Sequence, residues 1–175
     1  MSENYNEKNK GFIKRVSRLS PGDLAVLRRN ADNPQTNIKA LPILARIGAI
    51  DSFARSLTAC LYAVYHREND EPCEDSNFNF GSAFCEAIKS GNDFKPDEHD
   101  KRFKILIASE SEDLPFRLRQ AVKLIKSKNE RIDFSALLGD LYVWDKEDRR
   151  AQRKWVKGFY NLKEEENNNL NSEEE

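Results

Sequence analysis

The sequence is poor in residues that interrupt helices, with six prolines and seven glycines among 175 residues. Both residues disfavour helix interiors, and apolar side chains recur at intervals of three and four along most of the chain. The sequence therefore predicts an all-α protein. Its length suits one domain or two small lobes around a real core.

Segments for crossing or passing a membrane are also lacking. No apolar run approaches the roughly 20 residues that span a bilayer, and the first ten residues, MSENYNEKNK, are polar, unlike a signal peptide. Cys60, Cys73 and Cys85 are odd in number and include no CxxC pair, so we expect reduced thiols rather than a disulfide framework. We expect a cytoplasmic protein without a membrane partner.

Familiar catalytic motifs are missing as well. The chain has no Gly-rich phosphate loop, nucleophile elbow or HExxH. Glu98, His99 and Asp100 adjoin, but successive helical residues point about 100° apart and cannot converge on one metal. We therefore expect no enzymatic activity, no metal and no cofactor, and interpret these acids as part of a helix's first turn.

The formal net charge of −1 conceals an uneven distribution. Residues 164–175, EEENNNLNSEEE, hold six of the 30 acidic residues and none of the 29 basic ones, so the remainder carries +5. A mildly basic body is compatible with nucleic acid. The acidic tail has one apolar residue, Leu170, and its composition predicts disorder.

The amino-terminal half, residues 1–66, is predicted to be a helical lobe. After a frayed segment at 1–9, we expect a short helix over 12–19 and a second helix capped by Ser20. An apolar stripe over 38–47 contains Pro42, which predicts a kink. A longer helix over 52–66 places Phe53, Leu57, Leu61 and Tyr65 on one face.

Residues 67–79 are polar and acidic and are predicted to be a loop before a second lobe, 80–163. That lobe should contain helices starting near Phe80 and Pro96, and two more capped by Asp113 and Asp133. Trp144 and Trp155 lie on apolar helix faces, which predicts core packing.

The last helix carries the densest group of cations. Residues 137–160 read LLGDLYVWDKEDRRAQRKWVKGFY, and we expect Asp145 to cap the helix, with Asp148 three residues later. The apolar face comprises Ala151, Trp155, Gly158, Phe159 and Leu162. The opposite face comprises Arg149, Arg150, Arg153, Lys154 and Lys157.

Other cations fall at helix ends or faces, namely Arg28, Arg29, Lys101, Arg102, Arg117 and Arg119. Arginine suits phosphate because its planar fork donates two hydrogen bonds. Without a recognition helix or an aromatic strand, this distribution favours backbone binding over base reading.

Five motifs in this order resemble the CasB family: PGDLAVLRR, FNFGSAFCEAI, HDKRFKILIAS, DLPFRLRQAV and the segment 137–160. These proteins are the small subunits of the type I-E CRISPR surveillance complex, Cascade, and the resemblance covers residues 12–160. It implies a two-lobed, all-α, non-catalytic protein that sits as a pair beside the guide-RNA backbone subunits and the large subunit. It also implies contacts with target DNA, opened as an R-loop on the guide RNA.

By position, the resemblance carries DNA binding to Arg28, Arg29, Lys101, Arg102, Arg117, Arg119, Arg149, Arg150 and Arg153, with less weight on Lys154 and Lys157. The acidic loop and the acidic tail depart from the family pattern. Both would repel DNA, so we expect them to face away from its path.

Two other classes of function fit the residues. One is a transcription regulator with a helix-turn-helix, for which DKEDRRAQRKWVKGF would supply the helices; it would read bases and protect a specific site. The other is a helical adaptor whose cations pair with acidic proteins. Such an adaptor would not bind nucleic acid even at low salt.

Overall fold

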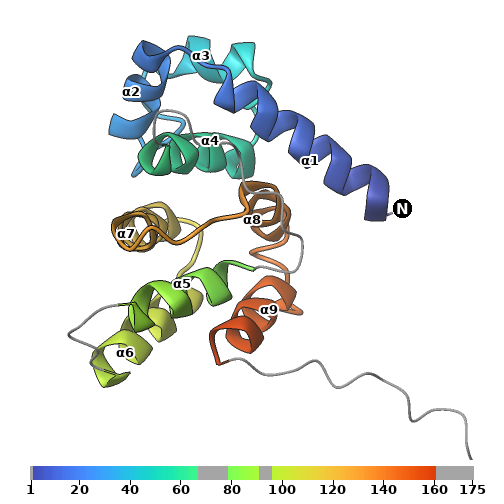
Figure 1. Cartoon of the computed structure of the whole chain (residues 1–175). Helices are drawn as coiled ribbons and strands as arrows, with labels where there is room; N and C mark the ends of the chain where they lie inside the picture. The colour runs from blue at the N-terminus through green and yellow to red at the C-terminus, as the bar shows by residue number, and fades with distance from the viewer. Residues whose placement is uncertain (1, 67–78, 91–95, 161–175) are drawn as a thin grey trace, which may run out of the picture.

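A computed structural model describes residues 2–66, 79–90 and 96–160, and these ranges contain nine α-helices and no strand (Figure 1). The helices are α1 (Ser2–Ser17), α2 (Pro21–Arg29), α3 (Leu41–Arg46), α4 (Phe53–Tyr65), α5 (Phe80–Lys89), α6 (Pro96–Ile107), α7 (Leu114–Ser127), α8 (Phe134–Leu141) and α9 (Arg150–Phe159). The all-α prediction is confirmed. The acidic tail, and the acidic loop except Asn79, lie outside the described residues.

Short polar side chains begin several helices. Ser20 Oγ accepts a hydrogen bond from the Asp23 amide (3.1 Å) at α2, and Asp133 Oδ1 accepts from the Ala136 amide (3.0 Å) at α8. These bonds satisfy amides that a helix start leaves unpaired, and both caps were predicted. The prediction for Asp113 is half right, because it stands at the N-cap position before α7 but its side chain makes no capping bond.

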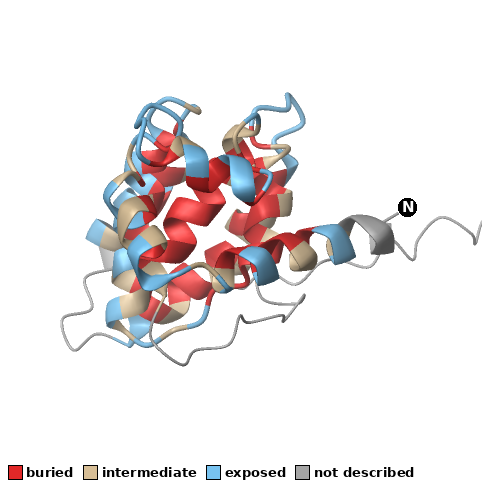
Figure 2. Ribbon diagram, turned by 90° about the horizontal axis from the view of Figure 1, so that it is seen from above, coloured by how far each residue is buried: buried red, intermediate tan, exposed pale blue. Residues whose placement is uncertain are grey.

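Helix α4 is the centre of the fold. It packs against α2 on one side and against α7 and α8 on the other (Figure 1), and every residue from Ser56 to Val64 is buried. The sequence predicted one inward face, whereas the structure covers the helix all round. Buried hydrophobic residues of both halves form one cluster, and exposed residues surround it (Figure 2).

Two of the three cysteines lie in the described part, where Cys60 and Cys85 are both free and buried, as the prediction of reduced thiols requires. Cys60 stands in the middle of α4. Burial raises the pKa of its thiol to about 12, so it stays protonated at neutral pH.

The amino-terminal prediction was wrong in two places. Residues 2–9 are helical rather than frayed, because α1 continues along α8, where buried Asn9 Nδ2 donates to the Ser135 carbonyl at 3.3 Å. Pro42 stands in the first turn of α3 and starts that helix instead of kinking a longer one. Ile38, the first residue of the predicted apolar stripe, precedes the helix and is 81% exposed.

Helices α5 and α9 cross so closely that two glycines are required. A Cβ atom on Gly81 would overlap the backbone of Trp155, and one on Gly158 would overlap the side chains of Asn79 and Ser82. The Trp155 ring packs 4.7 Å from that of Phe80 and is fully buried. The core role predicted for both tryptophans is confirmed, since Trp144 is also buried.

A buried carboxylate fixes α9 to α8. Asp140 Oδ2 accepts a hydrogen bond from Trp155 Nε1 at 2.7 Å, and Lys154 Nζ lies 3.1 Å from Asp140 Oδ1. Burial raises the pKa of the Asp140 carboxyl above its ordinary value, while Lys154 and the Trp155 indole oppose that rise. The contribution of Asp140 to the stability of the fold therefore depends on pH.

The first prediction concerns the α5–α9 crossing. Gly81→Ala should lower the free energy of unfolding by about 1–3 kcal/mol, because the added methyl group meets backbone that cannot turn aside. Gly11→Ala is the matched control, since a Cβ atom there meets nothing within 4 Å, and it should stabilise α1 by about 1 kcal/mol. Urea unfolding followed by circular dichroism measures both. A Gly81→Ala protein as stable as the wild type would contradict the close crossing.

The second prediction concerns Asp140. Because the folded carboxyl binds its proton more tightly than the unfolded one, protonation stabilises the fold below the unfolded pKa of 3.8, and this contribution disappears as pH rises through the folded pKa. Asp140→Asn lacks this titration. The free energy of unfolding of the variant, minus that of the wild type, should therefore increase from about pH 4 to about pH 7.

Lys154→Met provides the companion measurement. Lys154 lowers the pKa of Asp140, so its removal should raise that pKa further and extend the pH-dependent loss of stability to higher pH. Parallel pH profiles for Asp140→Asn and the wild type would show that this carboxyl does not titrate differently in the folded protein.

Candidate nucleic-acid interface

The basic helix α9 begins later than the sequence predicted. It starts at Arg150, and Arg149 before it adopts a left-handed backbone conformation with φ of 50°. Asp145 does not cap it, because the Asp145 carboxylate accepts a hydrogen bond from Ser111 Oγ instead. Asp148 Oδ1 accepts from the Arg150 amide at 3.2 Å. The left-handed turn at Arg149, rather than the predicted capping by Asp145 with Asp148, sets the direction of α9.

The two faces predicted for α9 are present. Ala151, Trp155 and Phe159 are buried, and Gly158 fits against Asn79, whereas Leu162 lies outside the described residues. Among the predicted cations, Arg149, Arg150 and Arg153 are exposed, and Lys154 and Lys157 are partly exposed. Lys154 forms the ion pair with Asp140, so the α9 cations without an ion pair within the described part are Arg149, Arg150 and Arg153.

Two further predicted residues have structural partners. Arg28 Nε, at the end of α2, donates to the Ala63 carbonyl at 2.8 Å, and Arg119 of α7 pairs with Asp32. Lys126, outside the predicted set, donates to the carbonyls of Val64 (2.9 Å) and His66 (3.1 Å). Arg28 and Lys126 thus complement the carboxyl end of α4, where the helix dipole favours cations.

A groove of about 490 Å³ lies between α6 and α7. Its apolar lining comes from Phe84, Ile105, Leu106, Ala121 and Leu124, and its polar lining from Arg102, Arg117, Gln120, Lys123 and Ser127. Arg117 also lies over the Phe116 ring, 5.6 Å from its centroid, and that ring is 49% exposed. We call Arg102, Arg117 and Lys123 the groove cations.

The groove includes one cation that the predicted set omitted. Lys123 follows Arg117 and Gln120 at intervals of three, a spacing that keeps polar residues on neighbouring positions of a helix surface. That spacing could have identified Lys123 from the sequence. Arg29 and Lys101 are exposed on α2 and α6, but neither lines the groove.

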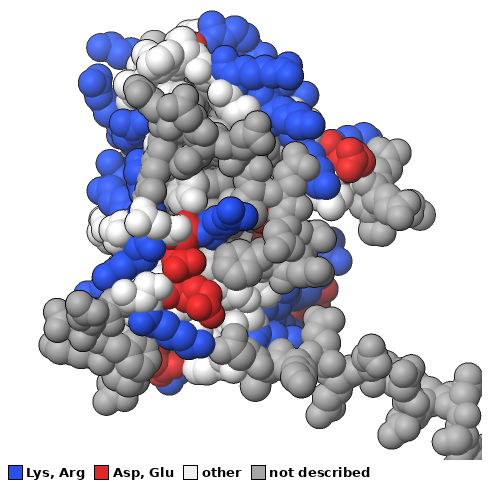
Figure 3. All heavy atoms as spheres, in the orientation of Figure 1, with Lys and Arg blue, Asp and Glu red and all other residues white. Residues whose placement is uncertain are grey.

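The predicted cations lie in separate groups. Figure 1 places α2, α7 and α6 along the left of the molecule and α9 at its lower right, beyond α5. Figure 3 shows Lys and Arg side chains along that left margin. The structure therefore brings Arg102 and Arg117 together, and likewise Arg149, Arg150 and Arg153, but it does not bring α2 and α9 together.

The acids around His99 have other roles. Asp100 on α6 accepts a hydrogen bond from the Tyr160 hydroxyl and forms an ion pair with Lys104. Hydrogen bonds from Lys104 and Tyr160 hold the pKa of Asp100 below its ordinary value. Across the described ranges, no three His, Cys, Asp or Glu side chains are placed to hold a metal, and no helix is long and apolar enough to cross a membrane.

Comparisons with solved structures agree on the fold. The chain superposes on CasB from M. ruber with a TM-score of 0.71 and 30% identity, over 87% of this chain and 92% of that one. It also shares its fold with a chain of a CRISPR RNA-guided surveillance complex, at a TM-score of 0.73 and 20% identity, over 90% and 94% of the two chains.

Sequence comparisons lead to the same family, and they confirm the resemblance to CasB. The chain is 39% identical over 61 residues to the CRISPR-associated protein Cse2 of Thermus thermophilus, a match that spans 35% of this chain and 34% of that relative. The model of the CRISPR-associated protein Cse2 family matches residues 23–160. The chain belongs to the CRISPR-associated protein Cse2 family.

Proposed function

We propose that this protein is a non-catalytic small subunit of a CRISPR Cascade complex and that it stabilises target DNA opened as an R-loop by binding phosphates. Family membership and the fold shared with a chain of a surveillance complex support a subunit role. The observation that carries the DNA contact is the exposure of Arg149, Arg150 and Arg153, which have no acidic partner among the described side chains.

The chemistry fits a backbone ligand. Arginine donates paired hydrogen bonds to phosphate oxygens, and such contacts give affinity without reading sequence. The exchange of a DNA duplex for a guide–target duplex is nearly balanced in free energy in RNA-guided effectors of a different type, and the same energetics apply here. A few phosphate contacts are therefore enough to favour the open state.

The structure refines which residues carry the proposal. Lys154, Arg119 and Arg28 donate to partners inside the protein, so we assign them mainly to stability. The proposed phosphate contacts are Arg149, Arg150 and Arg153 at α9 and Arg102 and Arg117 at the groove, with Arg29, Lys101 and Lys157 as further exposed or partly exposed cations. Because α9 and the groove lie apart, we propose two contact regions rather than one continuous track.

The proposed assembly follows the family. We propose that two lobes, divided at residues 67–79, present these regions within a complex that contains guide-RNA backbone subunits, a large subunit and a second copy of this chain. The guide RNA would pair with the target strand there, in the cytoplasm.

The third prediction tests α9. In assembled complexes, Arg149→Asn with Arg153→Gln should weaken target DNA binding and reduce the slope of log affinity against log salt by about one to two units, because fewer counterions are released. Asparagine is chosen at position 149 because it tolerates the positive φ there. Binding should weaken equally for all target sequences while the guide RNA stays bound.

Lys8→Gln with Lys14→Gln is the matched control, since it removes two exposed charges from α1 and should leave the slope unchanged. Equal slopes for the α9 variant and the control would remove α9 from the DNA path and favour the protein adaptor. Loss of binding at one particular sequence only would favour the helix-turn-helix regulator.

The fourth prediction concerns catalysis. The purified protein should not cleave DNA or RNA in the presence of magnesium, manganese or zinc, because its charged residues serve binding and packing. Incubation with labelled single and double strands, resolved on denaturing gels, measures this. Cleavage that copurifies with the protein and disappears on substitution of one carboxylate would contradict the proposal.

A further inference from the structure

The α6–α7 groove combines an apolar floor with a cationic rim. Phe84, Leu106 and Ala121 are buried beneath it, and the edge of Ile105 is 38% exposed. The groove cations line it together with this floor, and no acidic side chain among the described residues does so. A ligand that fills it must therefore offer negative charge together with an apolar group.

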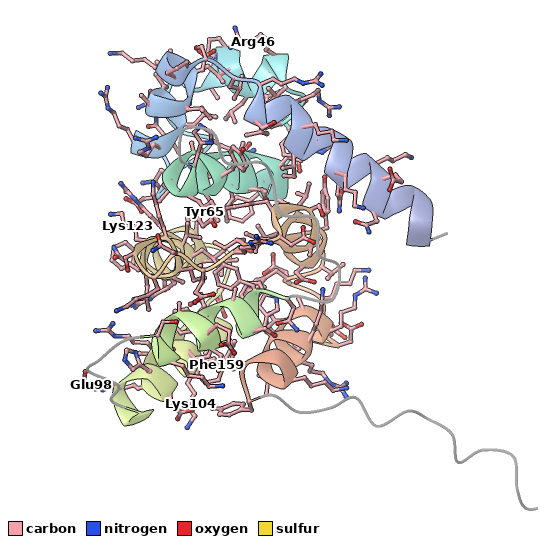
Figure 4. All side chains as sticks on the ribbon, in the orientation of Figure 1. Arg46, Tyr65, Glu98, Lys104, Lys123 and Phe159 are labelled. Carbon is pink, nitrogen blue, oxygen red and sulfur yellow. The ribbon has the colours of Figure 1, made fainter. Side chains whose placement is uncertain are left out.

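The described chain ends against α6, one of the two helices that border this groove. Phe159, the last residue of α9, stacks on Phe103 of α6 with ring centroids 3.9 Å apart, and Tyr160 bonds Asp100 of the same helix. The Phe159 ring also lies 6.0 Å from that of Phe84, which lines the groove. Figure 4 labels Phe159 and, on α7, the groove residue Lys123. The last described residue, Tyr160, is thus attached to a helix that borders the groove.

The segment that follows has the complementary chemistry. Residues 164–175 contain six glutamates, no cation and a single apolar residue, Leu170. Leu170 is the tenth residue after Tyr160, and an extended chain of ten residues reaches about 33–36 Å. We infer that the acidic tail, residues 164–175, binds its own α6–α7 groove, with glutamates on the groove cations and Leu170 on the apolar floor.

Attachment favours this occupant over a separate protein. A tethered segment meets its site at an effective concentration in the mM range, so weak ion pairs suffice. The contact also has a consequence for the proposed function, since Arg102 and Arg117 cannot bind tail and phosphate together. The tail would then lie on the proposed DNA path, rather than face away from it as the sequence led us to expect, and would act as a removable competitor for DNA. Its binding to the groove does not depend on that function.

The fifth prediction uses a labelled peptide of residues 161–175 and the full chain, without nucleic acid. In one full-chain variant the six tail glutamates are changed to glutamine, which frees the groove. This variant should bind the peptide at least about tenfold more tightly than the wild type, whose tail occupies the site. Fluorescence anisotropy at low salt measures both affinities.

Further changes in the neutral-tail chain locate the site. Arg102→Gln, Arg117→Gln and Lys123→Gln together should weaken peptide binding by about tenfold. The matched control, Lys8→Gln, Lys14→Gln and Lys39→Gln, removes three exposed charges elsewhere and should weaken it far less. A peptide with Leu170→Ser should also bind about tenfold more weakly to the unaltered groove.

Three results would overturn the inference. Equal affinity of the wild-type and neutral-tail chains would show that the tail leaves the groove empty. Equal losses in the groove and control variants would show only general charge attraction. Blocking that disappears when the wild-type protein is diluted would assign the groove to the tail of a second copy.

Discussion

Burial of the carboxyl end of α4 is the constraint on which the arrangement of the other helices depends. A helix end leaves carbonyl groups without partners, and this end lies between α2 and α7. Arg28 and Lys126 supply the missing donors from those two helices. Two cations that look like surface charges in the sequence therefore hold α2 and α7 against α4, and Lys126 of α7 joins the carboxyl-terminal helices to the amino-terminal ones.

The basic helix depends on a second, smaller constraint. Gly81 and Gly158 let α5 and α9 approach until backbone meets backbone, and Asp140 ties Trp155 and Lys154 to α8. With its inner face fixed in this way, α9 holds Arg149, Arg150 and Arg153 outward. The exposed arginines are thus placed by the packing of the opposite face, so they need no rearrangement of the fold to meet a ligand.

Local signals predicted much of this fold, because they depend on neighbours in sequence. Ser20 and Asp133 bond amides two or three residues ahead, and the periodicity of α9 separates Trp155 from Arg153. Contacts between residues distant in sequence could not be predicted in this way. The pairing of Arg119 with Asp32, the extension of α1 along α8 and the diversion of Asp145 to Ser111 all join residues distant in sequence. The same limit explains why the sequence could not show that the predicted cations lie in separate groups.

The buried thiol of Cys60 can report when the helices around α4 separate. Burial in α4 and a pKa of about 12 leave no reactive thiolate in the closed fold. A reagent in solution can meet that sulfur only after helices on one side of α4 have separated. The rate at which Cys60 is alkylated therefore measures how often the helices packed on α4 separate. Since α4 joins both halves of the chain, a subunit whose Cys60 stays unlabelled through assembly has kept its core closed throughout.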